Sequence, residues 1–297
     1  MFNVKKRGFW FAAFIFLLFV FCLSIFIFYS KEELKPEWDL TRTIRYGFVL
    51  QNTSSQPLQN IVFKTYSPLV LSSSQKLIEI TSSTKFTKHR DSYENQQIWF
   101  DIGFIPPYGK KSISITAKLL MSSVIAGAAN ETNLYTSEQP KIESNNEAII
   151  ELSHQFKGIP TTKKFQKLIY EWQIDNMTYI GYGFKNKGAV YALTNLEGDC
   201  TEFAYLNVAI NRALGVASRA VNGYVVNHDS KLVASEYHTW SEVWLDGGWH
   251  VVDAQKKEFM NNQQNYIAMN IVTDTLTDNN QFNRFWVSNP NLTVTMK

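Results

Sequence analysis

The sequence is poor in cysteine and lacks the motifs typical of cofactor-binding proteins. It contains two cysteines, Cys22 and Cys200, among 297 residues. It has no His, Cys, Asp or Glu spacing typical of a metal site, no Gly-rich phosphate-binding loop, no internal repeat and no second nucleophile motif. The net charge of +3 comes largely from three basic residues near the start, which gives no argument for nucleic-acid binding. We therefore expect no metal, no other cofactor and no nucleic-acid partner.

Residues 8–29 form a long apolar run without a charged residue. Such a run can cross a bilayer as a helix, which takes about 20 residues. Basic residues at positions 5–7 precede it, so the positive-inside rule predicts a cytoplasmic segment at residues 1–7 and an exported remainder, periplasmic or on the cell surface. A cleaved signal peptide is the alternative, but no small-x-small cleavage site follows. We predict a single-pass anchor, which leaves Cys200 as a lone thiol in an oxidising compartment with little structural use for it.

Residues 38–122 have the pattern of an antiparallel β-domain. Apolar and polar residues alternate clearly in 44–48 and 113–117, and helical periodicity is missing. We expect a small all-β sandwich-like domain. It either positions a substrate or protein partner or acts as a spacer above the membrane. Residues 123–147 are small and polar and predict a linker. The strands are expected at 41–52, 59–68, 76–83, 96–107 and 110–120.

Cys200 stands at the expected start of a buried helix. A turn signal precedes it, and Asp199 or Thr201 supplies the N-cap. Over residues 202–214 apolar positions recur at helical spacing, and Gly215 is typical of a helix end. The dipole and the free backbone N–H groups at such a start favour thiolate over thiol and are suited to stabilise an oxyanion. The polar positions of this helix are Glu202, Asn207, Asn211 and Arg212.

Other segments of the second half give weaker signals. Residues 165–172 are spaced as one helical face, with Thr161 or Thr162 as the cap, and an apolar segment lies around residues 191–196. After Asp253 the chain runs through Asn-rich loops. It then ends in FNRFWVSNP and LTVTM, which predict a closing strand or hairpin.

His238 and Asp253 lie on two segments that predict a β-hairpin. The first segment places His238 and Trp240 on one face by the period-two rule. A two-residue turn at Asp246 and Gly247 sets Trp240 opposite Asp253, with His238 one diagonal step away, about 7–8 Å at the backbone. A three-residue loop puts His238 and Asp253 on opposite faces. The sequence leaves both registers open.

Residues 198–253 carry these groups in an order that resembles the transglutaminase-like superfamily of papain-like thiol enzymes, in a membrane-anchored bacterial type. The resemblance implies that Cys200 is the nucleophile, that His238 is the general base and acid, and that Asp253 orients the imidazole. One departure is Ala254-Gln255 after the aspartate, where the family commonly has Pro-Thr. The matching residues are Gly198, Cys200, Arg212, Gly215, Arg219, Gly223, Tyr224, His238, Trp240, Trp249 and Asp253.

The resemblance implies an α+β fold for residues 148–297, with the cysteine-bearing helix packed on an antiparallel sheet. It implies an enzyme that acts on amide bonds of peptide or protein substrates. The reaction is hydrolysis, as by a cysteine protease or amidohydrolase, or acyl transfer to an amine. A catalytically silent binding or scaffold protein is the alternative. The oxyanion side chain stays open among Trp172, Tyr191 and Asn195, and the two arginines of the pattern are expected to pair with carboxylates as structural groups.

Overall fold

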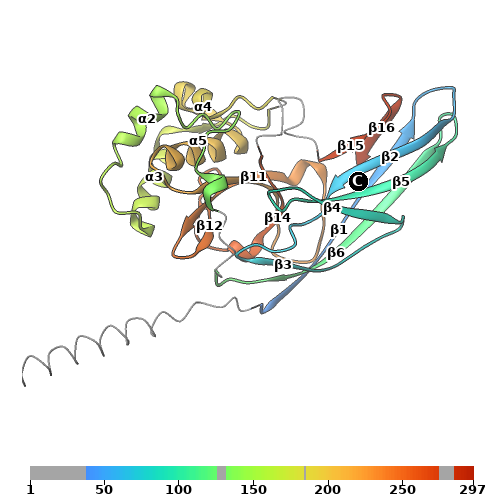
Figure 1. The fold of residues 1–297 in the computed structure, drawn as a ribbon, viewed down its shortest axis with the longest axis horizontal. Coiled ribbons are helices and arrows are strands. Elements are labelled where there is room, and N and C mark those ends of the chain that lie inside the picture. The colour runs from blue at the N-terminus through green and yellow to red at the C-terminus, as the bar shows by residue number, and fades with distance from the viewer. Residues whose placement is uncertain (1–37, 126–131, 184, 274–283) are drawn as a thin grey trace, which may run out of the picture. The chain divides into compact units, whose positions relative to one another are not determined.

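The alternating segments of the first half fold into two sheets that share one core, and both are antiparallel except for one short strand pair. The computed structural model describes residues 38–297 apart from 126–131, 184 and 274–283. The strands are β1 Leu40–Asn52, β2 Leu58–Tyr66, β3 Gln75–Ser82, β4 Phe86–Arg90, β5 Gln96–Ile105, β6 Lys110–Met121, β10 Ser230–Lys231, β15 Phe285–Val287 and β16 Leu292–Met296. One sheet has the order β10-β1-β6-β3, with β16 also on β1, and the other has the order β15-β2-β5-β4 (Figure 1).

The inner faces of these sheets follow from the alternation in the sequence. Ile44 pairs with Ala117 and Phe48 with Ile113 across β1 and β6, and all four side chains are buried. The five strands that the sequence predicts are therefore present, and the all-β expectation for this region is confirmed. Strand β4 was not predicted, because nearly all of its side chains are exposed and polar, as at an edge where no buried face imposes a pattern.

The strands near the chain end belong to the sandwich as well. β15 pairs with β2, and β16 pairs with β1. The sequence analysis grouped these strands with residues 148–297, and the structure instead uses them to extend both sheets of the first region. The alternation in the LTVTM segment predicts a strand but says nothing about its partner, because pairing over such a sequence separation leaves no local signal. The other boundaries of the predicted domains stay a prediction.

The second region combines helices with a mixed-length antiparallel sheet of order β13-β12-β11-β9-β14. In Figure 1 the helices gather on one side of this sheet. The α+β expectation is thus confirmed. The elements are α2 Glu147–His154, α3 Lys163–Asn176, β7 Thr178–Tyr179, α4 Ala189–Asn195, β8 Glu197–Gly198, α5 Cys200–Ala213, β9 Ser218–Val225, β11 Tyr237–Leu245, β12 Gly248–Asp253, β13 Glu258–Phe259 and β14 Tyr266–Ile271, with short 3-10 turns at Thr132–Tyr135, Ala234–Glu236 and Gln263–Asn265.

Helix α5 is buried on all sides, including the positions that the sequence marks as polar. Its amides are satisfied inside the protein: Asn207 Nδ2 donates to Gln173 Oε1 at 2.8 Å, and Gln166 Nε2 donates to Asn211 Oδ1 at 2.7 Å. A buried polar group costs little when its hydrogen bonds are kept. These hydrogen bonds hold α5 in one rotation about its axis and one position along it, between α3 and β11. The position of Cys200, its first residue, is set in the same way.

The two regions share a junction within one compact unit, residues 36–297. The side chain of Gln75 joins β3 to β14 through hydrogen bonds to both backbone groups of Ala268, at 2.9 and 3.1 Å. The segment expected as a linker is packed where the structure describes it, since Tyr135 and Ile142 are buried. The sheet that carries His238 is therefore held firmly against the sandwich.

Within the described ranges, no helix is long and apolar enough to cross a membrane. The anchor predicted at residues 8–29 lies outside those ranges.

Candidate functional site

Cys200 is the first residue of α5, and it is partly exposed. A capping box starts the helix: Asp199 Oδ1 accepts the N–H of Thr201 at 2.7 Å, and Glu202 Oε2 accepts the N–H of Asp199 at 3.0 Å. Of the two N-caps that the sequence allows, Asp199 is the one used. The backbone N–H of Cys200 has no acceptor among the described residues, so it is available as an oxyanion donor beside the thiol.

Gly198 is required by this helix start. A Cβ added at Gly198 would lie 2.3 Å from the Cβ of Glu202, the residue that closes the capping box. Any larger residue would have to move the first turn of α5. The glycine before the cysteine thus has a steric cause, which is the close approach of the chain to Glu202.

The hairpin that carries His238 and Asp253 has the two-residue register. Asp246 and Gly247 form the turn with φ values of 50° and 86°, as a type I′ turn requires. Leu245 pairs with Gly248, and the ladder continues to Ser241 opposite Val252. Continuing this ladder by one pair brings the end of β12 opposite the face of β11 that carries His238. The register with Asp253 on the same face as His238 is confirmed.

His238 interacts with both of the other residues of the predicted triad. Its Nε2 lies 2.6 Å from Asp253 Oδ2, and the side chain of Cys200 is near enough to act on the pKa of the imidazole. Burial tends to lower the pKa of His238, but its interactions with Asp253 and Cys200 outweigh burial and raise this pKa to about 9. The imidazolium is therefore favoured at neutral pH, and it is the form that can give a proton to a leaving amine.

Asp253 is buried and held from two further sides. The hydroxyl of Tyr266 donates to Asp253 Oδ2 at 2.9 Å, and the N–H of Lys256 donates to Asp253 Oδ1 at 3.1 Å. Burial and then the charge of Asp253 raise the pKa of Tyr266 above its ordinary value, so the phenol keeps the proton that it donates. The sequence analysis missed Tyr266, because its strand β14 lies in a stretch that reads as Asn-rich loops.

A chain of contacts runs along β11 away from the triad. The Trp240 ring lies 6.3 Å from the His238 ring at an interplanar angle of 24°, and its Nε1 donates to Glu242 Oε1 at 3.2 Å. Glu242 in turn accepts from Arg219 Nη2 at 2.7 Å, and both side chains are buried. For Arg219 the expected pairing with a carboxylate is confirmed. Arg212 donates to the carbonyl oxygens of Ser218 and Ser137.

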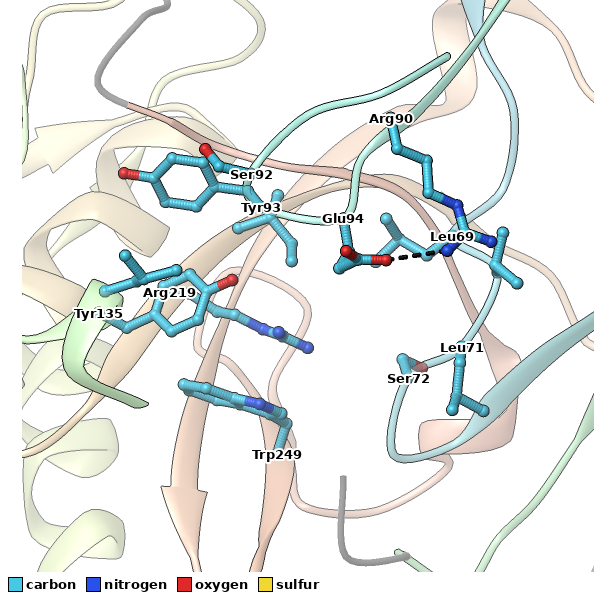
Figure 2. Close-up of a pocket in the computed structure, with 13 residues that line it drawn as sticks. Leu69, Leu71, Ser72, Arg90, Ser92, Tyr93, Glu94, Tyr135, Arg219 and Trp249 are labelled. Carbon is cyan, nitrogen blue, oxygen red and sulfur yellow. Dashed lines mark hydrogen bonds and ion pairs between the residues drawn. The ribbon is translucent and has the colours of Figure 1, made fainter. Parts of the chain in front are cut away.

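Arg219 also lines a cavity of about 420 Å³ between the sandwich loops and the second sheet. Figure 2 shows its guanidinium between the rings of Tyr135 and Trp249, and the centre of the guanidinium lies 4.2 Å from the Trp249 ring. On the opposite wall Arg90 pairs with Glu94 at 3.0 Å. Both arginines of the cavity are thus already paired with carboxylates. The cavity lacks the three triad residues, so it is separate from the site around Cys200.

The candidate oxyanion side chains have other contacts. Tyr191 donates its hydroxyl proton to Glu197, Asn195 Nδ2 donates to the Tyr191 carbonyl at 3.0 Å, and Trp172 packs on the helical core. The choice of an oxyanion side chain among these three stays a prediction.

The remaining histidine of the hairpin lies apart from the triad. His250 Nε2 donates to the Leu245 carbonyl at 3.1 Å, and burial lowers the pKa of His250. Among the described residues, no group of three or more His, Cys, Asp or Glu side chains is arranged to hold a metal ion.

The family model of the transglutaminase-like superfamily matches residues 150–254. A curated relative, an uncharacterised protein of Mycobacterium leprae, is 27% identical over 108 residues, which are 35% of this chain and 38% of that protein. The match therefore spans well under half of the relative. Residues 150–254 belong to the transglutaminase-like superfamily.

Solved structures share the fold at low sequence identity. The crystal structure of a proposed cysteine protease from Cytophaga hutchinsonii has a TM-score of 0.58 at 15% identity, and the match covers 87% of this chain and 92% of that one. The periplasmic domain of TgpA from Pseudomonas aeruginosa gives a TM-score of 0.38 at 16% identity, over 71% of this chain and 68% of that one. The first similarity extends over most of both chains, so the sandwich and the second region occur together in another solved protein.

Proposed function

We propose that this protein is a thiol enzyme that acts on amide bonds of peptide or protein substrates through Cys200, His238 and Asp253. The observation that carries the proposal is the hydrogen bond of His238 to Asp253, with the imidazole within electrostatic reach of Cys200 at the start of α5. A histidine placed in this way can move a proton between nucleophile and leaving group while the carboxylate holds its orientation. A merely structural cysteine has no need of such a partner.

The reaction has two stages. The Cys200 thiolate attacks the amide carbonyl carbon, and the oxygen takes the negative charge beside the Cys200 N–H. The imidazolium of His238 gives its proton to the amide nitrogen, the carbon–nitrogen bond breaks, and an amine leaves a thioester on Cys200. In the second stage neutral His238 takes a proton from water or from an incoming amine, which attacks the thioester. The product is an acid or a new amide, and the thiolate–imidazolium pair is restored.

The choice between hydrolysis and transfer depends on which nucleophile reaches the thioester. The test is to incubate the full chain with a peptide library, with and without an added primary amine, and to read the masses. Cleavage or deamidation alone supports hydrolysis, and incorporation of the amine supports transfer.

Cys200→Ala is expected to abolish both products while the far-ultraviolet circular dichroism spectrum stays unchanged. If Cys200→Ala retained activity, the triad would not be the reacting site. A folded wild-type protein that yields no product and whose Cys200 labels no faster than an exposed thiol would favour a silent binding protein.

We further propose that the enzyme is exported and anchored by residues 8–29. The support is the uncharged apolar run and the basic residues that precede it. The sandwich would then act as a spacer or position a protein partner.

A further inference from the structure

Exposed apolar side chains cluster beside Cys200, on the helix side of the triad. Tyr179 is 49% exposed, Ile180 is 46% exposed and Tyr182 is 59% exposed. The three residues lie within four consecutive positions of the chain. Single exposed apolar residues are ordinary on a protein surface, but a contiguous group is typical of a binding surface. The exposure of these three side chains together therefore indicates a surface that binds a ligand.

The backbone holds this group against the start of α5. Tyr179 pairs with Gly198 between the parallel strands β7 and β8, and the N–H of Ile180 donates to the Gly198 carbonyl at 3.1 Å. Further on, the N–H of Gly183 donates to Asp199 Oδ2 at 2.9 Å. Burial and then the charge of Cys200 raise the pKa of Tyr179, so the phenol lies within electrostatic reach of the thiol. We call Tyr179 and Ile180 the helix-side wall.

The chemistry of the triad orients a substrate beside the helix-side wall. The leaving nitrogen must take its proton from His238, so the amine half of the substrate lies toward His238. The carbonyl oxygen must lie at the start of α5, where the Cys200 N–H is free. The acyl half then extends along the helix-side wall.

We propose that Tyr179 and Ile180 bind an apolar or aromatic side chain on the carbonyl side of the scissile amide. This inference rests on the proposed function, because it assigns a substrate class to the same site. Burial of an apolar side chain against this wall favours binding of the acyl group that carries it. A preference of about tenfold or more for apolar over unsubstituted acyl groups is therefore expected.

The test labels Cys200 with acyl-side mimics, which needs no known substrate. N-acetyl-phenylalanyl chloromethyl ketone and N-acetyl-glycyl chloromethyl ketone each lose chloride to the thiolate and form a thioether. Rates are measured by intact mass on the full chain and divided by the iodoacetamide rate of the same variant. The phenylalanyl reagent is expected to react about tenfold faster than the glycyl reagent. In the double variant Tyr179→Ser/Ile180→Ser this ratio is expected to fall to about twofold or less.

Phe104→Ser and Ile78→Ser are matched controls, because these side chains are 56% and 48% exposed on the sandwich. Both controls are expected to keep the full ratio. Equal rates for the two reagents in the wild type, or an unchanged ratio in the double variant, would overturn the helix-side wall. Failure of iodoacetamide itself to react preferentially at Cys200 would instead count against the thiol-enzyme function, so the two failures are distinguishable.

Discussion

At the residue scale, Asp253 is the fixed point of the candidate site. Its carboxylate accepts from His238, from Tyr266 and from the backbone of Lys256, which come from three different segments. Because the carboxylate is 3% exposed, these hydrogen bonds offset the loss of its hydration. The position of Asp253 is thus set by its surroundings, and the imidazole orients against it.

Tyr266→Phe tests this arrangement. The change keeps the ring and removes the hydroxyl that donates to Asp253 Oδ2 at 2.9 Å. We expect a loss of about 1.5–3 kcal/mol in the free energy of unfolding, the worth of a hydrogen bond to a charged group. Urea denaturation followed by tryptophan fluorescence gives the value. Tyr108→Phe is the control, since Tyr108 is 63% exposed, and it should change stability little. An equal effect of both substitutions would show that Tyr266 does not support Asp253.

The pKa of His238 predicts the alkaline limit of activity. This pKa is raised to about 9, and in the proposed reaction the imidazolium gives its proton to the leaving amine. Amide cleavage or transfer should therefore decline as pH rises through about 9. His250→Ala should leave that limit in place, whereas His238→Ala should abolish turnover as Cys200→Ala does. A limit near pH 6.5, the ordinary value for histidine, would contradict the contacts proposed to hold the proton.

The same shift has a consequence for folding. The folded-state pKa of His238 lies above its unfolded value of about 6.5. The resulting stabilisation is fully present below pH 6.5 and is lost as pH rises through about 9. Unfolding in urea at pH 6 and at pH 10 should differ more for the wild type than for His238→Gln. No difference between the two proteins would mean that His238 titrates alike in both states.

The sequence predicted some residues of the candidate site and missed others. Cys200, His238 and Asp253 stand in an ordered pattern, so the sequence named them, and the structure brings the three together. Tyr266 carries no such signal, because its role depends on the pairing of β14 with β9. The helix-side wall has no motif either, since exposure beside Cys200 is visible only in three dimensions.

At the element scale, the start of α5 is the most constrained local structure of the site. The capping box of Asp199 and Glu202 satisfies helix-end groups that would otherwise lack partners. Its geometry leaves no room for a side chain at Gly198. The capping box and Gly198 together therefore determine where α5 begins, and with it the position of the Cys200 thiol.

Gly198→Ala is expected to shift this helix start. The new Cβ would lie 2.3 Å from the Cβ of Glu202, so the first turn must move. We expect a loss of about 1–3 kcal/mol in stability, as for overpacking, together with slower alkylation of Cys200. Gly183→Ala is the matched control, because its Cβ would meet Asp199 Oδ2 at an ordinary 3.5 Å. If both variants were equally stable, the close approach at Gly198 would not constrain the helix.

Elements with a strong local signal were predicted, and those defined by distant partners were not. The cap at Asp199 and the stop at Gly215, which has a φ of 75°, bound α5 as the sequence indicates. The sequence left two hairpin registers open, and the structure has the one with the two-residue turn at Asp246 and Gly247. Strand β14 is buried on both faces, so its sequence does not alternate. The partners of β15 and β16 lie more than two hundred residues earlier in the chain.

At the scale of the whole molecule, the orientation across the membrane remains to be tested. We expect residues 31–297 outside the cytoplasm and residues 8–29 in the bilayer. Protease added to spheroplasts should digest the region beyond residue 31, and a cytoplasmic marker protein should survive. Protection of that region, or a mature N-terminus near Ser30, would rule out the uncleaved anchor.

The pairing of β15 and β16 with β2 and β1 bears on the order in which the chain can fold. As synthesis proceeds from the first residue, the sandwich lacks two of its strands until residues 285–296 have been made. The region that holds Cys200, His238 and Asp253 is therefore complete in sequence while β1 and β2 still lack these partners. Open edges are sites where other chains can pair, so the interval before closure is the one most exposed to aggregation. β15 and β16 therefore complete the sandwich last. The region that holds the proposed triad is inserted in sequence between them and the first six strands.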